Sequence, residues 1–326
     1  MPILQNTGCI DRHKIVDEFY PFASPENFTG MIIGNDLDSV LSAAVLHHRF
    51  GWDITGIYDY EILWYPGRFA DFRHQLFNGE LMAIDLDIYH EEVSSLGHHI
   101  IGDKEKADLP GHAQMLNPNE IRGISTENFH RKYPLGTIHF LLWLFNEEIT
   151  DELSRALIWL ADSAFINGQS HKYRENVAEW IKNYLKSRWL QASLEIIDTP
   201  DFEKLVVEKL FPLLESTGFS QGDGQIVSRH RKLSGFQCQY GNPNQARNRL
   251  LRLFRFVYQL TGWTSPNIPR VFGAHRGLRQ RMDGKELYEK YGSLHNFLEK
   301  EPVFSYVFPF RNQINYTIMK LNRNRL

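Results

Sequence analysis

Apolar and polar residues follow two alternating patterns along the first half of the chain. Short apolar runs, which are typical of buried strands, cover residues 30–33, 54–58, 81–85 and 99–101. Between and after these runs, apolar positions at helical spacing predict helices over residues 39–50, 69–77, 137–145 and 152–165. Strands and helices in alternation predict an α/β fold with a mostly parallel sheet flanked by helices.

The middle of the chain shows the helical pattern alone. Large apolar residues recur at helical spacing over residues 177–189, and we interpret this stripe as core. Thr199, Pro200 and Asp201 provide a capping hydroxyl, a first-turn proline and an acidic side chain, which together indicate the start of a helix.

A polar stretch with several glycines, residues 215–225, is typical of a linker. The length of 326 residues suffices for about two domains that each bury a core. We expect a first domain over residues 1–170, a helical connector over 171–220, and a second, basic α+β domain over 221–326.

Composition narrows the class of protein. Hydrophobic residues make up 42% of the chain, which excludes a disordered protein, and no run reaches the roughly 18 apolar residues of a membrane span. The amino terminus lacks the apolar region of a signal peptide. The only cysteines, Cys9 and Cys238, are far apart and predict no disulfide framework. We therefore expect a cytoplasmic protein that does not engage a membrane, and the oligomeric state is left open.

The chain carries a net charge of −3, but its cations are concentrated in one segment. Residues 224–282 contain eleven lysine and arginine residues and no aspartate or glutamate. This segregation predicts a face that binds a polyanion, such as nucleic acid. The expected contacts are Arg252 and Arg255 on a helix, and His275 and Arg276 in a glycine-containing loop. The alternative is a solvated helix face, or one paired with the acidic first domain.

Four separate segments supply candidate metal ligands. They are Asp36 and Asp38 after the first apolar run, Asp85 at the end of a later run, His98 and His99 in a short apolar stretch, and Asp162 after a helical stretch. Carboxylates combined with imidazole suit Mn²⁺ or Mg²⁺ better than a closed structural zinc site. Taken alone, the first two aspartates have a simpler alternative, because such residues also cap helices.

The order of these segments resembles the DHH phosphoesterase superfamily, which includes exopolyphosphatases, prune-like proteins, manganese pyrophosphatases, oligoribonucleases and RecJ-like exonucleases. The resemblance covers roughly the first half of the chain. The residues that resemble its four motifs are the stretch 34–39 with Ser42 and Ala43, then Asp85, then His98 and His99, then Asp162. Asn117–Pro118 and Gly136–Thr137 also look like the family pattern.

The resemblance implies a hydrolytic metal centre. It implies that one or two Mn²⁺ or Mg²⁺ ions are coordinated by Asp36, Asp38, Asp85, His98 and Asp162. Asp85 would bridge two ions and act in catalysis with the histidine pair, and His99 would face the substrate phosphate. Asn35, within the first motif, is a further expected substrate contact.

The chain departs from the family pattern at two positions. Ile32 stands where the family places a histidine or asparagine ligand, and Gly97 replaces the acidic residue before the histidine pair, which would orient an imidazole. Asp87, His90 and Asp103 are the candidates to compensate for the second change.

We expect a divalent-metal-dependent phosphoesterase that hydrolyses phosphodiester bonds, as an exonuclease does, in single-stranded or short nucleic acid. A first alternative is an exopolyphosphatase-like enzyme, which the first motif suggests. A second is a catalytically degraded protein that binds nucleic acid or a nucleotide, which the departures suggest.

Overall fold

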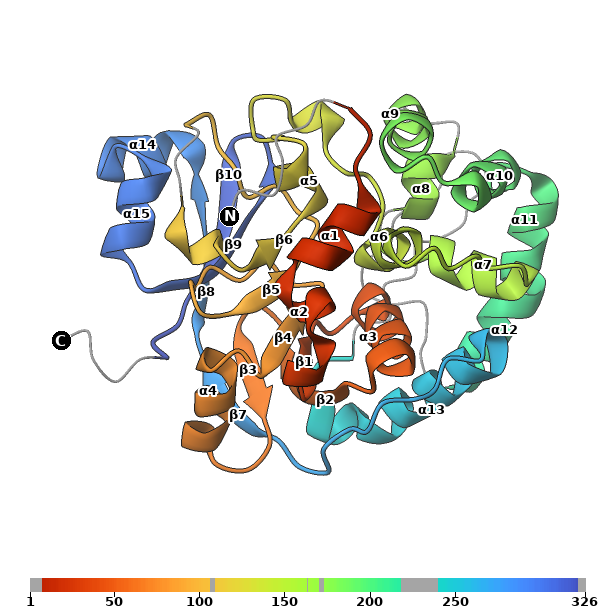
Figure 1. Cartoon of the computed structure of the whole chain (residues 1–326), viewed down its shortest axis with the longest axis horizontal. Helices are drawn as coiled ribbons and strands as arrows, with labels where there is room; N and C mark the ends of the chain where they lie inside the picture. Colours follow the sequence, from red (N-terminus) through yellow and green to blue (C-terminus); the bar gives the residue numbers. More distant parts are fainter. Residues whose placement is uncertain (1–7, 106–108, 163, 170–172, 218–239, 322–326) are drawn as a thin grey trace.

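The computed structural model describes residues 8–105, 109–162, 164–169, 173–217 and 240–321. Its main element is a seven-stranded sheet in the order β6-β5-β4-β1-β2-β3-β7 (Figure 1). Parallel pairing joins β1 (Gly30–Ile33), β2 (Asp53–Tyr58), β4 (Leu81–Ile84), β5 (Ser94–Leu96) and β6 (Met115–Leu116). At one edge, antiparallel pairing adds β3 (Ile62–Tyr65) and β7 (Gly273–Arg276). The expected mostly parallel α/β architecture is confirmed.

Helices cover both faces of this sheet. Successive strand residues point to opposite sides, and both sides carry apolar residues that need to be buried. In β1, Met31 and Ile33 join the larger apolar core, whereas Ile32 joins a smaller core on the other face. The larger core is built with α1 (Arg12–Glu18), α2 (Tyr20–Ala23), α3 (Leu37–Phe50), α6 (Thr137–Leu144) and α7 (Glu152–Trp159). The smaller core is covered by α4 (Phe69–Phe77).

The middle of the chain is helical, as expected. In Figure 1 it lies on the opposite side of the molecule from the two C-terminal helices, α14 (Gly284–Tyr291) and α15 (Leu294–Lys300). Its α-helices are α8 (Ala164–Gly168), α9 (Arg174–Glu179), α10 (Arg188–Ile196), α11 (Pro200–Leu205) and α12 (Phe211–Ser216), with π-helical turns at Trp180–Leu185 and Val206–Leu210. The helix start at Thr199 is confirmed, since its hydroxyl accepts a hydrogen bond from Phe202 N at 3.2 Å. The short helices elsewhere are α5 (Pro118–Ile121) and 3₁₀ turns at Pro25–Asn27, Pro110–His112 and Phe129–Arg131.

The elements after residue 240 divide between two places. α13 (Pro243–Thr261) packs against α3 and α7, and β7 joins the large sheet. The remaining elements form a second, antiparallel sheet in the order β8-β10-β9, with two helices: β8 (Leu278–Asp283), α14 (Gly284–Tyr291), α15 (Leu294–Lys300), β9 (Val303–Phe310) and β10 (Gln313–Ile318). The predicted linker lies largely outside the described residues, as does the predicted boundary at residue 221.

The small sheet packs against the large sheet near the carboxyl ends of its parallel strands. Tyr58, at the end of β2, hydrogen-bonds through its hydroxyl to Ser305 Oγ on β9 at 2.7 Å. Ile100 forms an isolated antiparallel bridge with Phe308. This contact brings β9 and β10 over the edge of the sheet where an α/β fold places its ligands.

Three sequence predictions need correction. The strand expected over residues 99–101 lies earlier in the chain, at Ser94–Leu96 (β5). Ile100 is buried, but it pairs with Phe308 of the small sheet in an isolated bridge and is not part of a strand of the large sheet. The helix expected over 152–165 ends at Trp159, and Asp162 follows with a positive φ of 50°. The loop expected around His275 is strand β7. Within the described ranges, no helix combines the length and apolar character that a membrane crossing requires.

Candidate metal site

The first turn of α3 carries two of the expected ligands. Asp36 is the N-cap of α3 and accepts a hydrogen bond from Ser39 N at 3.0 Å, so the capping role considered for it is real. Asp38 is almost fully buried one residue into the helix. The capping role does not remove Asp36 from the site, because both side chains line the same cavity.

Asp38 is held by the start of a second helix. Its two carboxylate oxygens accept hydrogen bonds from Thr137 N at 2.7 Å and from Ile138 N at 2.8 Å, at the N-terminus of α6. This helix end presents unpaired N–H groups and a positive dipole to the carboxylate. Gly136 permits the approach, since a Cβ at this position would lie 2.4 Å from a carboxylate oxygen of Asp38.

Asp85 follows β4 directly and has a positive φ of 60°, which turns the chain away from the strand. Its carboxylate accepts hydrogen bonds from Ser39 Oγ and Thr137 Oγ1, both at 2.7 Å. The same two residues thus connect Asp85 to the helices that hold Asp36 and Asp38. The three carboxylates belong to one hydrogen-bonded unit.

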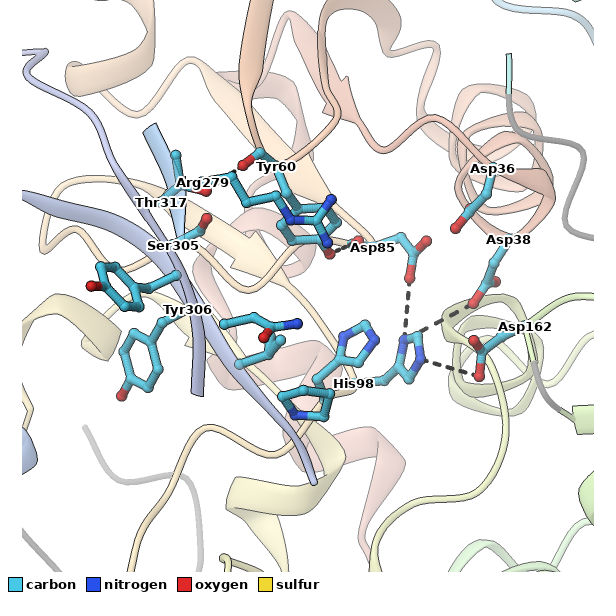
Figure 2. A pocket seen from close by; sticks show the side chains of 15 residues that line it. Asp36, Asp38, Tyr60, Asp85, His98, Asp162, Arg279, Ser305, Tyr306 and Thr317 are labelled. Atoms are coloured by element: carbon cyan, nitrogen blue, oxygen red, sulfur yellow. Dashed lines mark hydrogen bonds and ion pairs between the residues drawn. The ribbon is translucent and has the colours of Figure 1, made fainter. Parts of the chain in front are cut away.

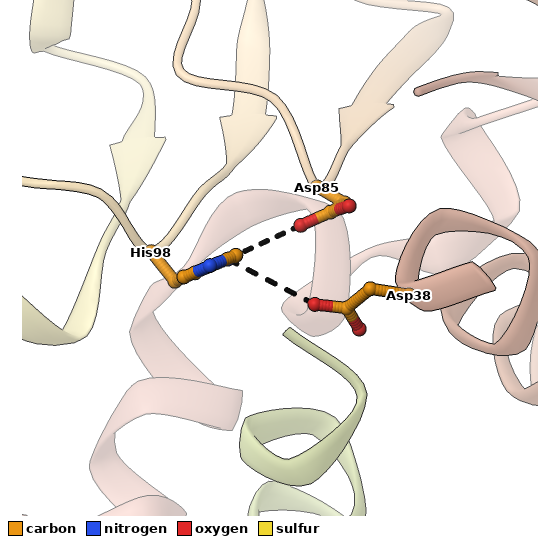
Figure 3. A group of neighbouring side chains, drawn as sticks. All are labelled: Asp38, Asp85 and His98. Atoms are coloured by element: carbon orange, nitrogen blue, oxygen red, sulfur yellow. Dashed lines mark ion pairs between the residues drawn. The ribbon is translucent and has the colours of Figure 1, made fainter. Parts of the chain in front are cut away.

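His98 lies between the acidic groups (Figure 2 and Figure 3). Its Nδ1 is 3.1 Å from an Asp85 oxygen and 4.0 Å from an Asp38 oxygen, and it also contacts Thr137 Oγ1 at 2.9 Å. Because the threonine hydroxyl donates to Asp85, it accepts from the imidazole Nδ1–H. On the other side of the ring, His98 Nε2 is 3.6 Å from Asp162 Oδ2. The structure therefore places Asp162 at the site.

Burial and mutual charge shift the ionisation of these groups. Burial, followed by the charge of Asp85, raises the pKa of Asp36 to about 8 and raises the pKa of Asp38 well above its usual value. Burial alone would lower the pKa of His98, but hydrogen bonds and charges from Asp162 and Asp85 raise it well above the ordinary value. Burial opposes ionisation of Asp85 as well, yet its contacts with His98, Ser39 and Thr137 lower its pKa.

The donor set fits a divalent cation. Asp38, Asp85 and His98 each offer a ligand atom, and these atoms lie within 4.8 Å of one another. Asp36 and Asp162 line the same cavity. The raised pKa values of Asp36 and Asp38 indicate an excess of buried negative charge, which a divalent cation would offset. Carboxylate oxygens with one imidazole nitrogen form a ligand set that suits Mn²⁺.

Ile32, the first departure from the family pattern, contributes no ligand. It is buried in the smaller core beneath the sheet. The second departure is different, because Asp87 is buried near Gly97 and accepts a hydrogen bond from His99 Nδ1 at 2.8 Å. The other two candidates have partners of their own: Asp103 accepts from Tyr288 Oη, and His90 accepts from Glu92 N and stacks on Phe77.

The acidic cluster forms one wall of a cavity of about 230 Å³, and the small sheet forms the opposite wall. The facing side chains come from β8, β9 and β10 and include Arg279, Ser305 and Thr317 (Figure 2), with Asn315 on the same face of β10 as Thr317. Tyr60 lies between the two walls, with the Arg279 guanidinium 5.6 Å from its ring centre. Sequence reasoning missed these residues, apart from counting Arg279 among the concentrated cations.

The expected substrate contacts outside the acidic cluster do not line this cavity, although His99 does. Asn35 lies beside the site, where its carbonyl accepts a hydrogen bond from Tyr240 N at 3.2 Å. His275 stacks on Phe69, and Arg276 forms an ion pair with Glu61 at 3.5 Å, both at the β7 edge of the large sheet. Arg252 and Arg255 are exposed on α13, as expected.

The fold and site define an α/β protein with a buried carboxylate and histidine cluster at the carboxyl edge of its parallel strands. Comparisons with protein-family models, with curated proteins and with solved structures find no match to the chain.

Proposed function

We propose that the chain is a divalent-metal-dependent phosphoesterase with a DHH-like site, which uses Mn²⁺ or Mg²⁺ to hydrolyse phosphodiester bonds in single-stranded or short nucleic acid. One observation carries the proposal. Asp38, Asp85 and His98 come from three separate segments and offer ligand atoms within 4.8 Å of one another beside a cavity. Burial of several ionisable side chains lowers the stability of a protein, so such clusters are found mainly at functional sites. The cluster is therefore a candidate functional site.

In this proposal the protein's own residues divide between metal and substrate. Asp36, Asp38, Asp85, His98 and Asp162 would hold one or two ions. A bound ion supplies Lewis-acid stabilisation of the phosphoryl oxygens and activation of water. Thr137 and Ser39 orient Asp85 through their hydroxyl groups, so the carboxylate keeps its position as charge develops nearby.

The opposite wall supports an anionic substrate. Arg279 is a cation that lines the cavity, and its guanidinium can bind a phosphate through two N–H groups. Tyr60 adds aromatic surface, against which a base can stack. The cavity between the two sheets has a volume of about 230 Å³, which is too small for a duplex.

The exposed arginines of α13 support a polymeric substrate. Tyr240, just before this helix, donates hydrogen bonds to Gly34 O and Asn35 O, so α13 starts beside the first motif. From there, Arg252 and Arg255 extend the positive charge away from the site along the exposed face of the helix. Such a row of cations suits a phosphate backbone that continues beyond the cavity.

Hydrolysis of bis(p-nitrophenyl) phosphate and of a short oligonucleotide, with Mn²⁺ present, tests the proposal. Asp85→Ala and Asp162→Ala should abolish turnover of both substrates, and calorimetry should show weakened Mn²⁺ binding. Asp103→Asn is the matched control, because this buried aspartate contacts Tyr288 Oη rather than the cluster. Turnover that survives in the first two variants would refute the site, and turnover of polyphosphate but not of oligonucleotide would select an exopolyphosphatase.

A second candidate, a binding protein without catalysis, is favoured by one observation. The carboxylates already have partners without an ion, since Asp38 accepts two backbone N–H groups and Asp85 accepts two hydroxyls beside His98. The raised pKa of His98 makes it a cation that could stand in for a metal. Tight, salt-dependent oligonucleotide binding with no cleavage under any divalent ion would select this function.

A further inference from the structure

A carboxylate occupies the space that a side chain at position 97 would need. A Cβ on Gly97 would lie 2.0 Å from Asp87 Oδ1 and 2.4 Å from Asp87 Cγ. Both distances are far below the 3.0 Å that real Cβ contacts respect. The position of Asp87 therefore requires glycine at 97, and the acidic residue that the sequence lacks there is replaced in space by one from the segment after β4.

Asp87 is fully buried and has two side-chain donors. His99 Nδ1 and Asn117 Nδ2 both approach its carboxylate at 2.8 Å. Asn117 is itself fixed, because Nδ2 also donates to His99 O at 2.9 Å and Oδ1 accepts from Asn119 N at 2.8 Å. The carboxylate thus meets His99 in one orientation only.

This arrangement determines which ring nitrogen of His99 is left for a contact with a ligand in the cavity. Since Nδ1–H donates to Asp87, Nε2 is the ring nitrogen left for a ligand. The ring of His99 lines the cavity and stacks on His98 at a centroid distance of 4.3 Å. We propose that Asp87 is a positioning residue, which holds His99 with Nε2 towards the cavity, where the imidazolium form of the ring can donate Nε2–H to an oxygen of the substrate phosphate. This inference rests on the proposed function.

Asp87→Asn provides a selective perturbation of almost the same shape. The amide has one acceptor atom where the carboxylate has two, so its NH₂ group must face either Asn117 or His99. Asn117 cannot reverse its amide without losing its bonds to His99 O and Asn119 N. The new NH₂ group therefore faces His99, whose Nδ1 becomes the acceptor, and only the longer hydrogen bond of 3.4 Å from His99 N to Asp87 Oδ2 is lost. The expected result is a change of tautomer, from Nδ1–H to Nε2–H.

Nitrogen-15 NMR of histidine-labelled protein reads the tautomer without any need for activity. At a pH where the ring is neutral, the wild type should show the Nδ1–H form of His99 and Asp87→Asn the Nε2–H form. Asp103→Asn should leave the His99 signals unchanged. An Nε2–H form in the wild type, or an unchanged tautomer in Asp87→Asn, would overturn the proposal.

Kinetics with Mn²⁺ and bis(p-nitrophenyl) phosphate test the functional part. Asp87→Asn should lower kcat by about 10–100-fold, as is common for residues that orient an active-site imidazole. Mn²⁺ affinity should not change. The double variant Asp87→Asn/His99→Gln should be no slower than His99→Gln alone. A further loss in the double variant would mean that Asp87 acts by another route. A wild type that neither binds Mn²⁺ nor turns over would refute the proposed function, while the tautomer still reports on Asp87.

Discussion

Gly136→Ala tests how the start of α6 holds Asp38. The φ and ψ of Gly136, −81° and 169°, are open to alanine, so the substitution causes no backbone strain. The new Cβ would lie 2.4 Å from one carboxylate oxygen of Asp38 and 2.9 Å from its Cγ. Either the carboxylate or the first turn of α6 must move.

The size of the effect follows from the bonds at risk. Asp38 accepts two backbone N–H groups, and a hydrogen bond to a charged group contributes about 1.5–3 kcal/mol. Loss of one bond and strain in the other should lower the free energy of unfolding by about 3 kcal/mol. Mn²⁺ binding should also weaken, because the Asp38 oxygens move away from the ligand atoms of Asp85 and His98, which now lie within 4.8 Å of them.

Urea denaturation with EDTA, and again with Mn²⁺, measures both effects. Saturating Mn²⁺ at about 100 times its Kd should stabilise the wild type by about 2.7 kcal/mol, and Gly136→Ala by less. Gly284→Ala is the control, since its Cβ would meet Asn312 at an ordinary distance of 3.4 Å. If Gly136→Ala costs no more than this control, about 0.5 kcal/mol or less, the contact between Asp38 and α6 is not what fixes the ligand.

Further predictions concern other parts of the site. Gly97→Ala should lower the free energy of unfolding by about 1–3 kcal/mol by displacing Asp87, and an effect equal to that of Gly284→Ala would contradict this. In EDTA, the contribution of Asp36 to the free energy of unfolding, taken as the difference between the wild type and Asp36→Asn, should fall as the pH rises from about 4 to about 8, because the raised pKa of Asp36 makes the folded state bind more protons than the unfolded state in this range; Mn²⁺ should flatten this decline, and a rise would contradict it. Arg279→Ala should lower kcat/KM for a phosphodiester about tenfold or more with little change in Mn²⁺ affinity, whereas an unchanged kcat/KM would remove Arg279 from substrate binding. Arg252→Gln/Arg255→Gln should weaken oligonucleotide binding and reduce its salt dependence by about two phosphate contacts, and an equal loss in Lys14→Gln/Arg68→Gln would show a mere effect of net charge.

The acidic wall of the site was predictable because the position of each aspartate follows from the strand that precedes it. Asp36 and Asp85 each follow an apolar strand, and parallel neighbours such as β1 and β4 end at the same edge of a sheet. Their approach therefore follows once the alternation of strands and helices is read correctly. His98 and Asp162 were placed by resemblance of motif order, and the structure brings them to the same cluster.

The second wall was not predictable, because it depends on how two sheets pack. Ser305, Asn315 and Thr317 have no distinctive neighbours in the sequence, and they reach the cavity only because β9 and β10 lie over the carboxyl edge of the large sheet. The concentration of arginines was evident, but not its division. Arg279 lines the cavity, while Arg276, three residues earlier, pairs with Glu61 at the sheet edge.

Gly97 shows why a departure from a motif cannot be judged from its own position. Read along the chain, a glycine before the histidine pair means that a carboxylate is missing. In space, the same glycine leaves room for Asp87, whose carboxylate binds His99. The departure at Ile32 has no such counterpart, because that side chain points into the smaller core and supplies only packing. The two changes thus differ in kind: a carboxylate from another segment occupies the space left by Gly97, whereas Ile32 supplies packing alone, and we predict that this chain binds fewer ions than the proposed family's complete motif set would.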